Sequence, residues 1–270
     1  MNKLLNLFAF IAMVAINILA NVLPIGGLTT AEVSAKYQTL ITPAGFTFGI
    51  WGLIYFLLGI FVFLQLIFLD NNDTYSLGYM FALSCGLNIA WILAWQFEMI
   101  IVSFILIAAL WVVLKIIDNR NSVGRSIDGE VRDAGGQSNS YFCNLSFKIY
   151  YAWITAATLI ALVVTLTHLI PQLRLEANAV IIAIVGLVGL SAYAVKRLLV
   201  QKDIVFTLVT AWAILGVFIN HVGKGYKNMF PAVTICSIAL TVILTVASIV
   251  VFVRKYFLRK ETLQATNVVR

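Results

Sequence analysis

The sequence predicts an all-α integral membrane protein with eight transmembrane helices, and two observations support this. Hydrophobic residues make up 62% of the chain and charged residues only 11%, whereas a soluble domain has about 25% charged residues. The mean hydropathy is +1.00, and the apolar runs reach the length of about 20 residues that a helix needs to cross a bilayer. The expected spans are residues 4–23, 43–68, 77–97, 100–117, 149–167, 179–195, 204–219 and 231–253.

The first two spans are separated by a mixed, fairly polar segment, residues 25–41. A cleaved signal peptide is the alternative interpretation of the first span, but its apolar run is longer than a signal peptide usually has, so we expect a retained helix. Within the polar segment we expect a short helix around residues 31–37. The second span starts at Pro43, a position where the missing N–H group does no harm to a helix.

The later spans follow from similar signals. Only Glu98 and Met99 separate the third span from the fourth, so these two helices must form an antiparallel hairpin. Residues 118–147 are rich in Gly, Ser, Asn and mixed charge, and we expect them to form a flexible loop. In the sixth span, Gly186 and Gly189 allow another helix to approach closely. A basic tail, residues 254–270, follows the last span.

The positions of lysine and arginine predict the orientation, because cytoplasmic loops carry an excess of both. With eight spans the two termini share one side, and the other side keeps only Lys36, Arg174, Lys224 and Lys227 of the 18 basic residues. We therefore expect a multi-pass protein of the plasma (inner) membrane of a bacterium, with both termini in the cytoplasm. Topology accounts for the net charge of +7, so we expect no nucleic acid partner.

Residues for conventional catalysis are scarce in the spans as we place them. No Asp or Glu falls inside them and Lys115 lies only in the last turn of the fourth span, whereas ion-coupled transporters usually keep an ionisable group near the midplane and retinal proteins need a lysine there. His168, His221 and the three cysteines show no metal-ligand spacing. We expect neither a metal site nor an enzyme.

Aromatic residues recur at helical spacing inside the spans. Trp51 and Tyr55 lie four residues apart and therefore share one face of their helix. The other members of this pattern are Asn88, Trp91 and Trp95 in the third span and Tyr150 and Trp153 in the fifth. Simple packing, or a belt of Trp and Tyr at the headgroup level, is the alternative. A pocket lined by indoles and one amide suits a flat, conjugated, mostly apolar ligand.

These residues resemble motifs of the TspO/MBR family, the tryptophan-rich sensory proteins that include the mitochondrial translocator protein (peripheral benzodiazepine receptor). The family's second helix opens with a proline, followed eight residues later by Trp and four later by Tyr, as in Pro43, Trp51 and Tyr55. Its third helix carries Asn-x-Ala-Trp, matched by residues 88–91, and its fifth opens with Tyr-x-Ala-Trp, matched by residues 150–153. The resemblance covers about residues 4–167.

The resemblance implies a fold and a function. Residues 1–168 would form a five-helix bundle, residues 169–253 three additional transmembrane helices, and residues 254–270 a cytoplasmic tail. The bundle would bind a hydrophobic or tetrapyrrole-like ligand, such as a porphyrin or haem, under a lid formed by residues 25–41. The protein would sense or translocate this ligand, and it would form a homodimer. The implied ligand-binding residues are Pro43, Phe46, Trp51, Tyr55, Asn88, Trp91, Trp95, Tyr150 and Trp153.

Two other functions remain open at this point. One is a multi-pass transporter or permease that moves a small neutral solute and uses all eight helices. The other is a membrane enzyme acting on a lipid or isoprenoid substrate, which would need a carboxylate or metal cluster at the interface. Only scattered acidic residues of the expected loop are available for that role, and we expect them to be solvated: Asp118, Asp128, Glu130 and Asp133.

Overall fold

A computed structural model describes residues 2–23, 25–67, 79–127, 134–174, 176–223 and 225–268. Within these ranges the regular elements are all helical: α1 (Asn2–Val22), α2 (Thr30–Lys36), the 3-10 helix η1 (Gly45–Gly49), α3 (Ile50–Ile67), α4 (Met80–Gln96), α5 (Ile100–Ile127), α6 (Ala134–Leu169), the 3-10 helix η2 (Pro171–Arg174), α7 (Glu176–Gln201), α8 (Ile204–Val222) and α9 (Pro231–Val268). Among the described residues, seven helices are long and apolar enough to cross a membrane, and α4 is a shorter apolar helix. The predicted all-α membrane protein is confirmed.

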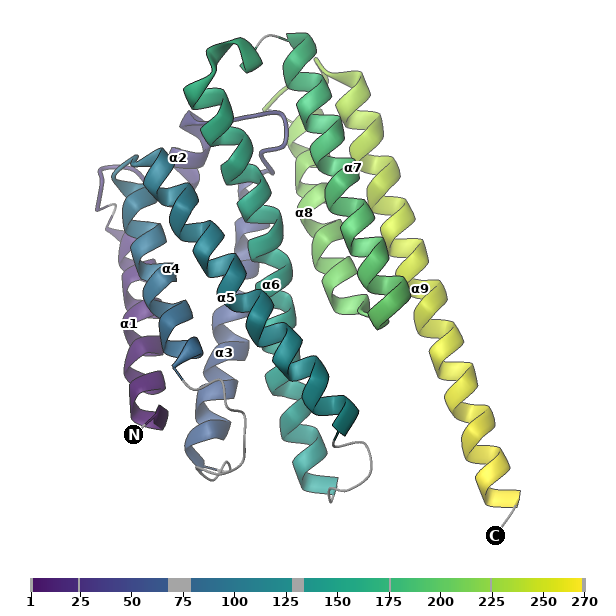
Figure 1. Ribbon diagram of the computed structural model, residues 1–270. Coiled ribbons are helices and arrows are strands. Elements are labelled where there is room, and N and C mark those ends of the chain that lie inside the picture. The colour runs from purple at the N-terminus through teal and green to yellow at the C-terminus, as the bar shows by residue number, and fades with distance from the viewer. Residues whose placement is uncertain are drawn as a thin grey trace.

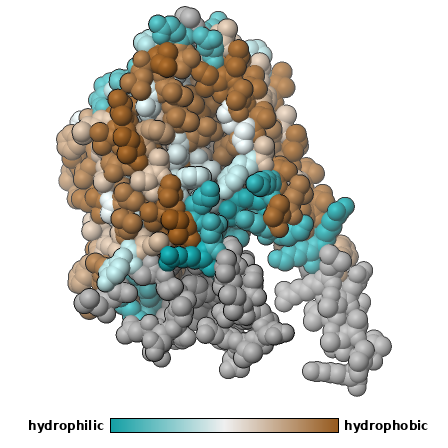
Figure 2. All heavy atoms as spheres, viewed as in Figure 1, coloured by the Kyte–Doolittle hydropathy of each residue, from teal (hydrophilic) through white to brown (hydrophobic). Residues whose placement is uncertain are grey.

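The long helices run alongside one another, and both termini lie at the same end of the molecule (Figure 1). This arrangement is the one expected of an even number of crossings; the cytoplasmic position of that end stays a prediction. Figure 2 shows a hydrophobic band between hydrophilic residues at the top and in the lower part of the molecule. Large apolar side chains such as Phe56 and Val200 are exposed in the structure, as expected where lipid replaces water as the surrounding solvent.

The short elements agree with the predictions for them. The helix α2 lies where a short helix was expected, and it starts with a capping box in which Thr29 and Glu32 bind each other's backbone N–H groups. The helices α4 and α5 form the predicted hairpin, with Glu98 in the left-handed region at φ 56° in the turn. Pro43, in contrast, precedes the first helical residue of η1, Gly45, and does not lie in a helical first turn.

The prediction of a flexible loop over residues 118–147 is wrong for the described part. The helix α5 continues to Ile127 and α6 already begins at Ala134; residues 128–133, with Asp128, Glu130 and Asp133, lie outside the described residues. Residues 118–127 and 134–147 contain no proline, the residue that ends a helix most effectively. These polar segments can therefore be helical. The tail is helical as well, because α9 extends to Val268.

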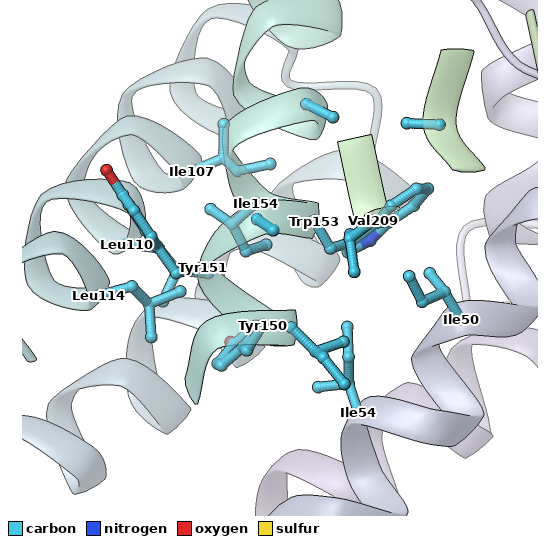
Figure 3. Packing of buried hydrophobic residues seen from close by; sticks show 14 of the residues in the cluster. Ile50, Ile54, Ile107, Leu110, Leu114, Tyr150, Tyr151, Trp153, Ile154 and Val209 are labelled. Atoms are coloured by element: carbon cyan, nitrogen blue, oxygen red, sulfur yellow. The ribbon is translucent and has the colours of Figure 1, made fainter. Parts of the chain in front are cut away.

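The first five long helices contact one another as a bundle, with α1 against α3 and α4, α4 against α5, and α6 against α3 and α5. The helix α8 packs on α6 and η1, while α7 and α9 pack on α8. One hydrophobic core therefore includes Ile54 of α3, Trp153 of α6 and Val209 of α8. In Figure 3, Tyr151 points from α6 toward Leu110 and Leu114, and Trp153 points the opposite way. The domain boundary at residue 168 stays a prediction.

Candidate ligand-binding site

Five of the predicted site residues form one cluster of rings around Trp51. Its indole stacks on Tyr55 at 5.5 Å and on Trp91 at 5.7 Å between ring centroids. Tyr150 and Trp153 meet the same indole edge-on, at 6.0 and 6.4 Å. These geometries are the offset-stacked and T-shaped arrangements that aromatic pairs prefer. The aromatic residues that recur at helical spacing on α3, α4 and α6 therefore lie together in the structure.

A chain of amide and hydroxyl groups lies beside these rings. Asn17 of α1 donates to the Oδ1 of Asn88 at 2.8 Å and to the backbone oxygen of Met13 at 2.9 Å. Asn88 of α4 in turn donates to the Tyr150 hydroxyl of α6 at 3.0 Å. Both asparagines are buried, and a buried amide is tolerated only when it is hydrogen-bonded. This network links three helices. Asn17 was missed in the sequence, although an Asn inside an apolar span was a signal for it.

A cavity of about 50 Å³ lies next to the cluster, lined by four tryptophans together with residues of α2, η1, α5 and α6. Its lining is Thr30, Ser34, Phe48, Trp51, Trp91, Trp95, Ile107, Trp153, Ala157, Ile160, Ala161 and Val164. A pocket for a drug-sized ligand has about 300–1,000 Å³. The aromatic side chains therefore fill most of the space that a tetrapyrrole would need.

Two polar groups of the cluster are buried without a hydrogen-bond partner among the described residues: the indole N–H of Trp153 and the hydroxyl of Tyr55. Leaving a buried donor unpaired costs about 1–3 kcal/mol. Trp95, at the edge of the cavity, is satisfied because its Nε1 donates to the backbone oxygen of Thr30 at 3.4 Å. These two unpaired donors therefore both belong to the ring cluster, whereas the Trp95 donor at its edge is paired.

Residues 25–41, which we call the lid, form hydrogen bonds and an ion pair with residues at the end of α4 and in the turn after it. Gln96 donates to the backbone oxygen of Ala20 at 3.0 Å and to the hydroxyl of Thr30 at 3.2 Å. The carboxylate of Glu98 pairs with Lys36 and accepts a hydrogen bond from the Tyr37 hydroxyl at 2.6 Å. The bond from Lys36, then that from Tyr37, lowers the pKa of Glu98 below its ordinary value of 4.5. The lid contact is therefore charged at neutral pH.

We expect Glu98→Gln to loosen the lid, because an amide makes weaker bonds to Lys36 and Tyr37 than a carboxylate does. Hydrogen exchange of the α2 amides should be faster in the variant than in the unchanged protein at pH 7. A carboxyl whose folded-state pKa is lowered stabilises the fold above its unfolded pKa and loses this effect as the pH falls. The difference between the two proteins should therefore shrink as the pH falls below about 4.3, the pKa of Glu in an unfolded chain. Equal exchange at pH 7 would contradict the expected role of Glu98.

Pro43 and Phe46 are not part of the ring cluster. The exposed ring of Phe46 meets Trp212 of α8 edge-on at 5.3 Å, and a Cβ built on Gly216 of α8 would lie 2.9 Å from the Cβ of Pro43. Sequence spacing gave no sign that a helix so distant in the chain would cover this segment. The assignment of all nine residues as ligand-binding stays a prediction.

A second polar cluster was missed, and it corrects one expectation. Asp118, expected in a solvated loop, lies buried in α5, where its Oδ2 is 2.8 Å from the Nη2 of Arg197. Arg197 of α7 also pairs with Asp203, the N-cap residue of α8, and Lys148 lies 3.3 Å from the same carboxyl group. Two acidic and two basic side chains thus balance each other where α5, α6, α7 and α8 meet.

Both histidines contact other side chains or the backbone within the described ranges. The ring of buried His221 lies 2.8 Å from the backbone oxygen of Leu40 and stacks on Tyr226 at 4.6 Å. His168 meets the Tyr37 ring edge-on at 6.2 Å. Among the described residues, no group of three or more His, Cys, Asp and Glu side chains is placed to hold a metal ion.

Comparisons with known proteins extend what the geometry indicates. The family model described as TSPO-like protein matches residues 3–250. The match runs from α1 into α9, so it is not confined to residues 4–167, which carry the resemblance in sequence. No curated protein and no solved structure matches this chain.

Proposed function

This chain belongs to the TSPO-like protein family, and on that premise we propose that it binds a flat, hydrophobic, tetrapyrrole-like ligand in the aromatic cavity under the lid. The observation that carries the proposal is the pair of unpaired buried donors, on Trp153 and Tyr55, within a cluster of stacked rings. A conjugated ligand with ring heteroatoms or polar substituents would stack on the rings and accept these hydrogen bonds. Binding would thereby remove a cost that the unliganded fold carries.

The small cavity means that a bound ligand must displace a side chain. Trp51 is the best candidate, because it is only half-buried while Tyr150 and Trp153 are fully buried. A ligand ring that entered beside the shifted Trp51 indole would stack on it, so this indole would remain one of the ligand's contacts. The free energy lost on moving Trp51 would be largely offset by equivalent contacts to the ligand.

Binding fits the cavity better than catalysis does. Its walls are indole and phenyl rings with aliphatic side chains, and the polar side-chain atoms are two hydroxyls, on Thr30 and Ser34, and the indole N–H groups. Such walls recognise an apolar ring system through burial and orientation. We propose sensing or translocation of the bound ligand as the consequence, with the lid controlling access.

The test is the combined replacement Trp51→Phe and Trp153→Phe. Protoporphyrin IX is titrated into the detergent-solubilised protein and its absorbance change is followed, because this signal does not depend on the number of tryptophans. We expect the double variant to bind about 1–3 kcal/mol more weakly, which is roughly a 5- to 150-fold rise in Kd. Trp111→Phe is the matched control, because Trp111 donates to Thr155 and does not line the cavity. Unchanged affinity in the double variant would overturn the proposal.

A further inference from the structure

A second, larger cavity of about 300 Å³ lies behind the lid, between the end of α6, the start of α7 and the loop before α9. Its apolar walls include Ile182 and Ala183 of α7 and Phe230. Tyr37 and Tyr226 add two phenol rings. This volume falls in the range of small-molecule pockets, and α7 and the loop before α9 contribute lining residues that the aromatic cavity does not have. The cavity is therefore distinct from the aromatic cavity, although Val164 lines both.

The charge around this cavity is unusual for its place in the topology. Only four basic residues fall on the side predicted to be outside, where Lys and Arg are generally scarce. Lys36 and Arg174 line the cavity, and Lys227 lies in the same loop as Tyr226 and Phe230. One carboxylate, that of Glu176, also lines it, so the lining carries a formal excess of one positive charge. Of the two basic residues in the lining, Lys36 already forms an ion pair with Glu98.

The guanidinium of Arg174 has N–H donors that are free to bind a ligand. Its Nε donates to the backbone oxygen of Thr167 at 3.0 Å, which fixes the plane of the guanidinium. Within the part of the chain that the structure describes, no hydrogen bond or ion pair is formed by its two Nη atoms. The charge of Arg174 also acts on the Tyr37 phenol, where it opposes the rise in pKa that the hydrogen bond to Glu98 causes. The guanidinium therefore lies close to the aromatic wall, and its free edge suits a carboxylate, which it can bind with two parallel bonds.

We propose that this cavity binds an amphiphile that carries a carboxylate and enters from the side predicted to be outside. The carboxylate is held by the Nη atoms of Arg174, and the apolar part packs between Ile182 and Phe230. Glu176 disfavours ligands with a second negative charge on that side. This site does not depend on the aromatic cavity, and either one can bind its ligand if the other does not.

The probe for the test is 2-naphthoate, compared with 2-naphthylmethanol, which has the same ring system without the charge. Binding to the full chain in detergent is measured by the fluorescence anisotropy of the naphthyl group. We expect saturable binding of the carboxylate, at least tenfold tighter than that of the alcohol. Arg174→Gln should remove this preference while leaving the alcohol's affinity unchanged. Ala179→Leu should weaken both probes, because Ala179 lines the cavity and the larger side chain fills it.

Two controls make the outcome specific. Lys227→Gln removes a nearby charge that does not line the cavity, and it should bind 2-naphthoate as the unchanged protein does. The Trp51→Phe, Trp153→Phe variant should also keep its affinity for 2-naphthoate, which separates this site from the aromatic cavity. Equal affinity for the two probes, or a carboxylate preference that survives Arg174→Gln in a protein with an unchanged unfolding midpoint, would overturn the proposal. Loss of 2-naphthoate binding in the tryptophan variant would place the probe in the aromatic cavity and would overturn it as well.

Discussion

Replacing Arg197 with glutamine is expected to destabilise the protein by about 3–5 kcal/mol, the scale of breaking a buried ion pair by removing one partner. The two carboxylates that Arg197 neutralises, on Asp118 and Asp203, are 2% and 1% exposed. Without the guanidinium, Lys148 would still pair with Asp203 at 3.3 Å, but the charge that Arg197 contributes would be lost. The measurement is the midpoint of thermal unfolding in detergent, which should fall by many degrees.

The surroundings of Arg197 leave little room for water to replace it. Its guanidinium carbon lies 4.5 Å from the centre of the Phe206 ring and 5.2 Å from that of Tyr151. These distances allow cation–π attraction, which is stronger for a desolvated cation. The Tyr151 hydroxyl lies 2.8 Å from the Tyr193 hydroxyl. A polar contact between α6 and α7 therefore lies next to the ion pairs of Arg197.

A second substitution separates the loss of charge balance from a general packing defect. Adding Asp118→Asn to Arg197→Gln leaves Asp203 and Lys148 as a balanced pair, so the double variant should be more stable than Arg197→Gln alone. The neighbouring, exposed Lys196 provides the matched control, and Lys196→Gln should change stability by no more than about 0.5 kcal/mol. An additive or larger loss in the double variant would contradict the charge-balance explanation.

The same cluster predicts a pH dependence. Burial by itself raises the pKa of Asp203, but the charge of Lys148 and the bonds from Arg197 outweigh it, so the net pKa lies below the ordinary value of 3.8. Because the folded-state pKa is lowered, the stabilisation by Asp203 is present above the unfolded pKa and is lost as the pH falls through the folded pKa. The stability gap between the unchanged protein and Arg197→Gln should therefore narrow below about pH 4.

The contrast between the two clusters explains what could be predicted from the sequence. Trp51 and Tyr55, or Tyr150 and Trp153, share a helix face by spacing alone, so their convergence needed only the assumption of a bundle. Asp118 was assigned to a solvated loop because a hydropathy pattern ends at the last apolar residue, whereas the helix α5 continues past it. Its partner Arg197 is 79 residues away in the sequence, and no local pattern indicates such a pairing.

The same limit applies to Pro43 and Phe46, which were assigned to the pocket. Their neighbours are Trp212 and Gly216 of α8, a helix more than a hundred residues away in the chain. Trp212 lies beside Phe46, and its Nε1 donates to the backbone oxygen of Thr47 at 3.1 Å. A helix from the C-terminal part of the chain thus supports the start of α3, which no motif of the resemblance covers.

Replacing Gly216 with alanine is the second change from which we expect a large effect. A Cβ at this position would overlap with the Oγ1 of Thr47 and would lie 2.9 Å from the Cβ of Pro43. The contact cannot open freely, because the Ala44 N–H donates to the Gly216 oxygen at 2.9 Å and Asn220 donates to the Thr42 oxygen at 2.9 Å. Overpacking at a site of this kind costs about 1–3 kcal/mol. The unfolding midpoint should fall, and protoporphyrin binding should weaken because Phe48 and Trp51 follow the displaced segment.

Gly189→Ala is the matched control. The close helix approach expected at Gly189 is not found, because an added Cβ would meet nothing within 4 Å in the described structure. The Gly189→Ala variant should leave binding unchanged and raise stability by about 0.5–1 kcal/mol, the usual gain for alanine over glycine within a helix. Adding Thr47→Ala to Gly216→Ala removes the nearer clashing atoms and should restore part of the lost stability. If Gly216→Ala is as stable as Gly189→Ala, then α8 does not hold the start of α3, and the cavity walls are positioned by the first five long helices alone.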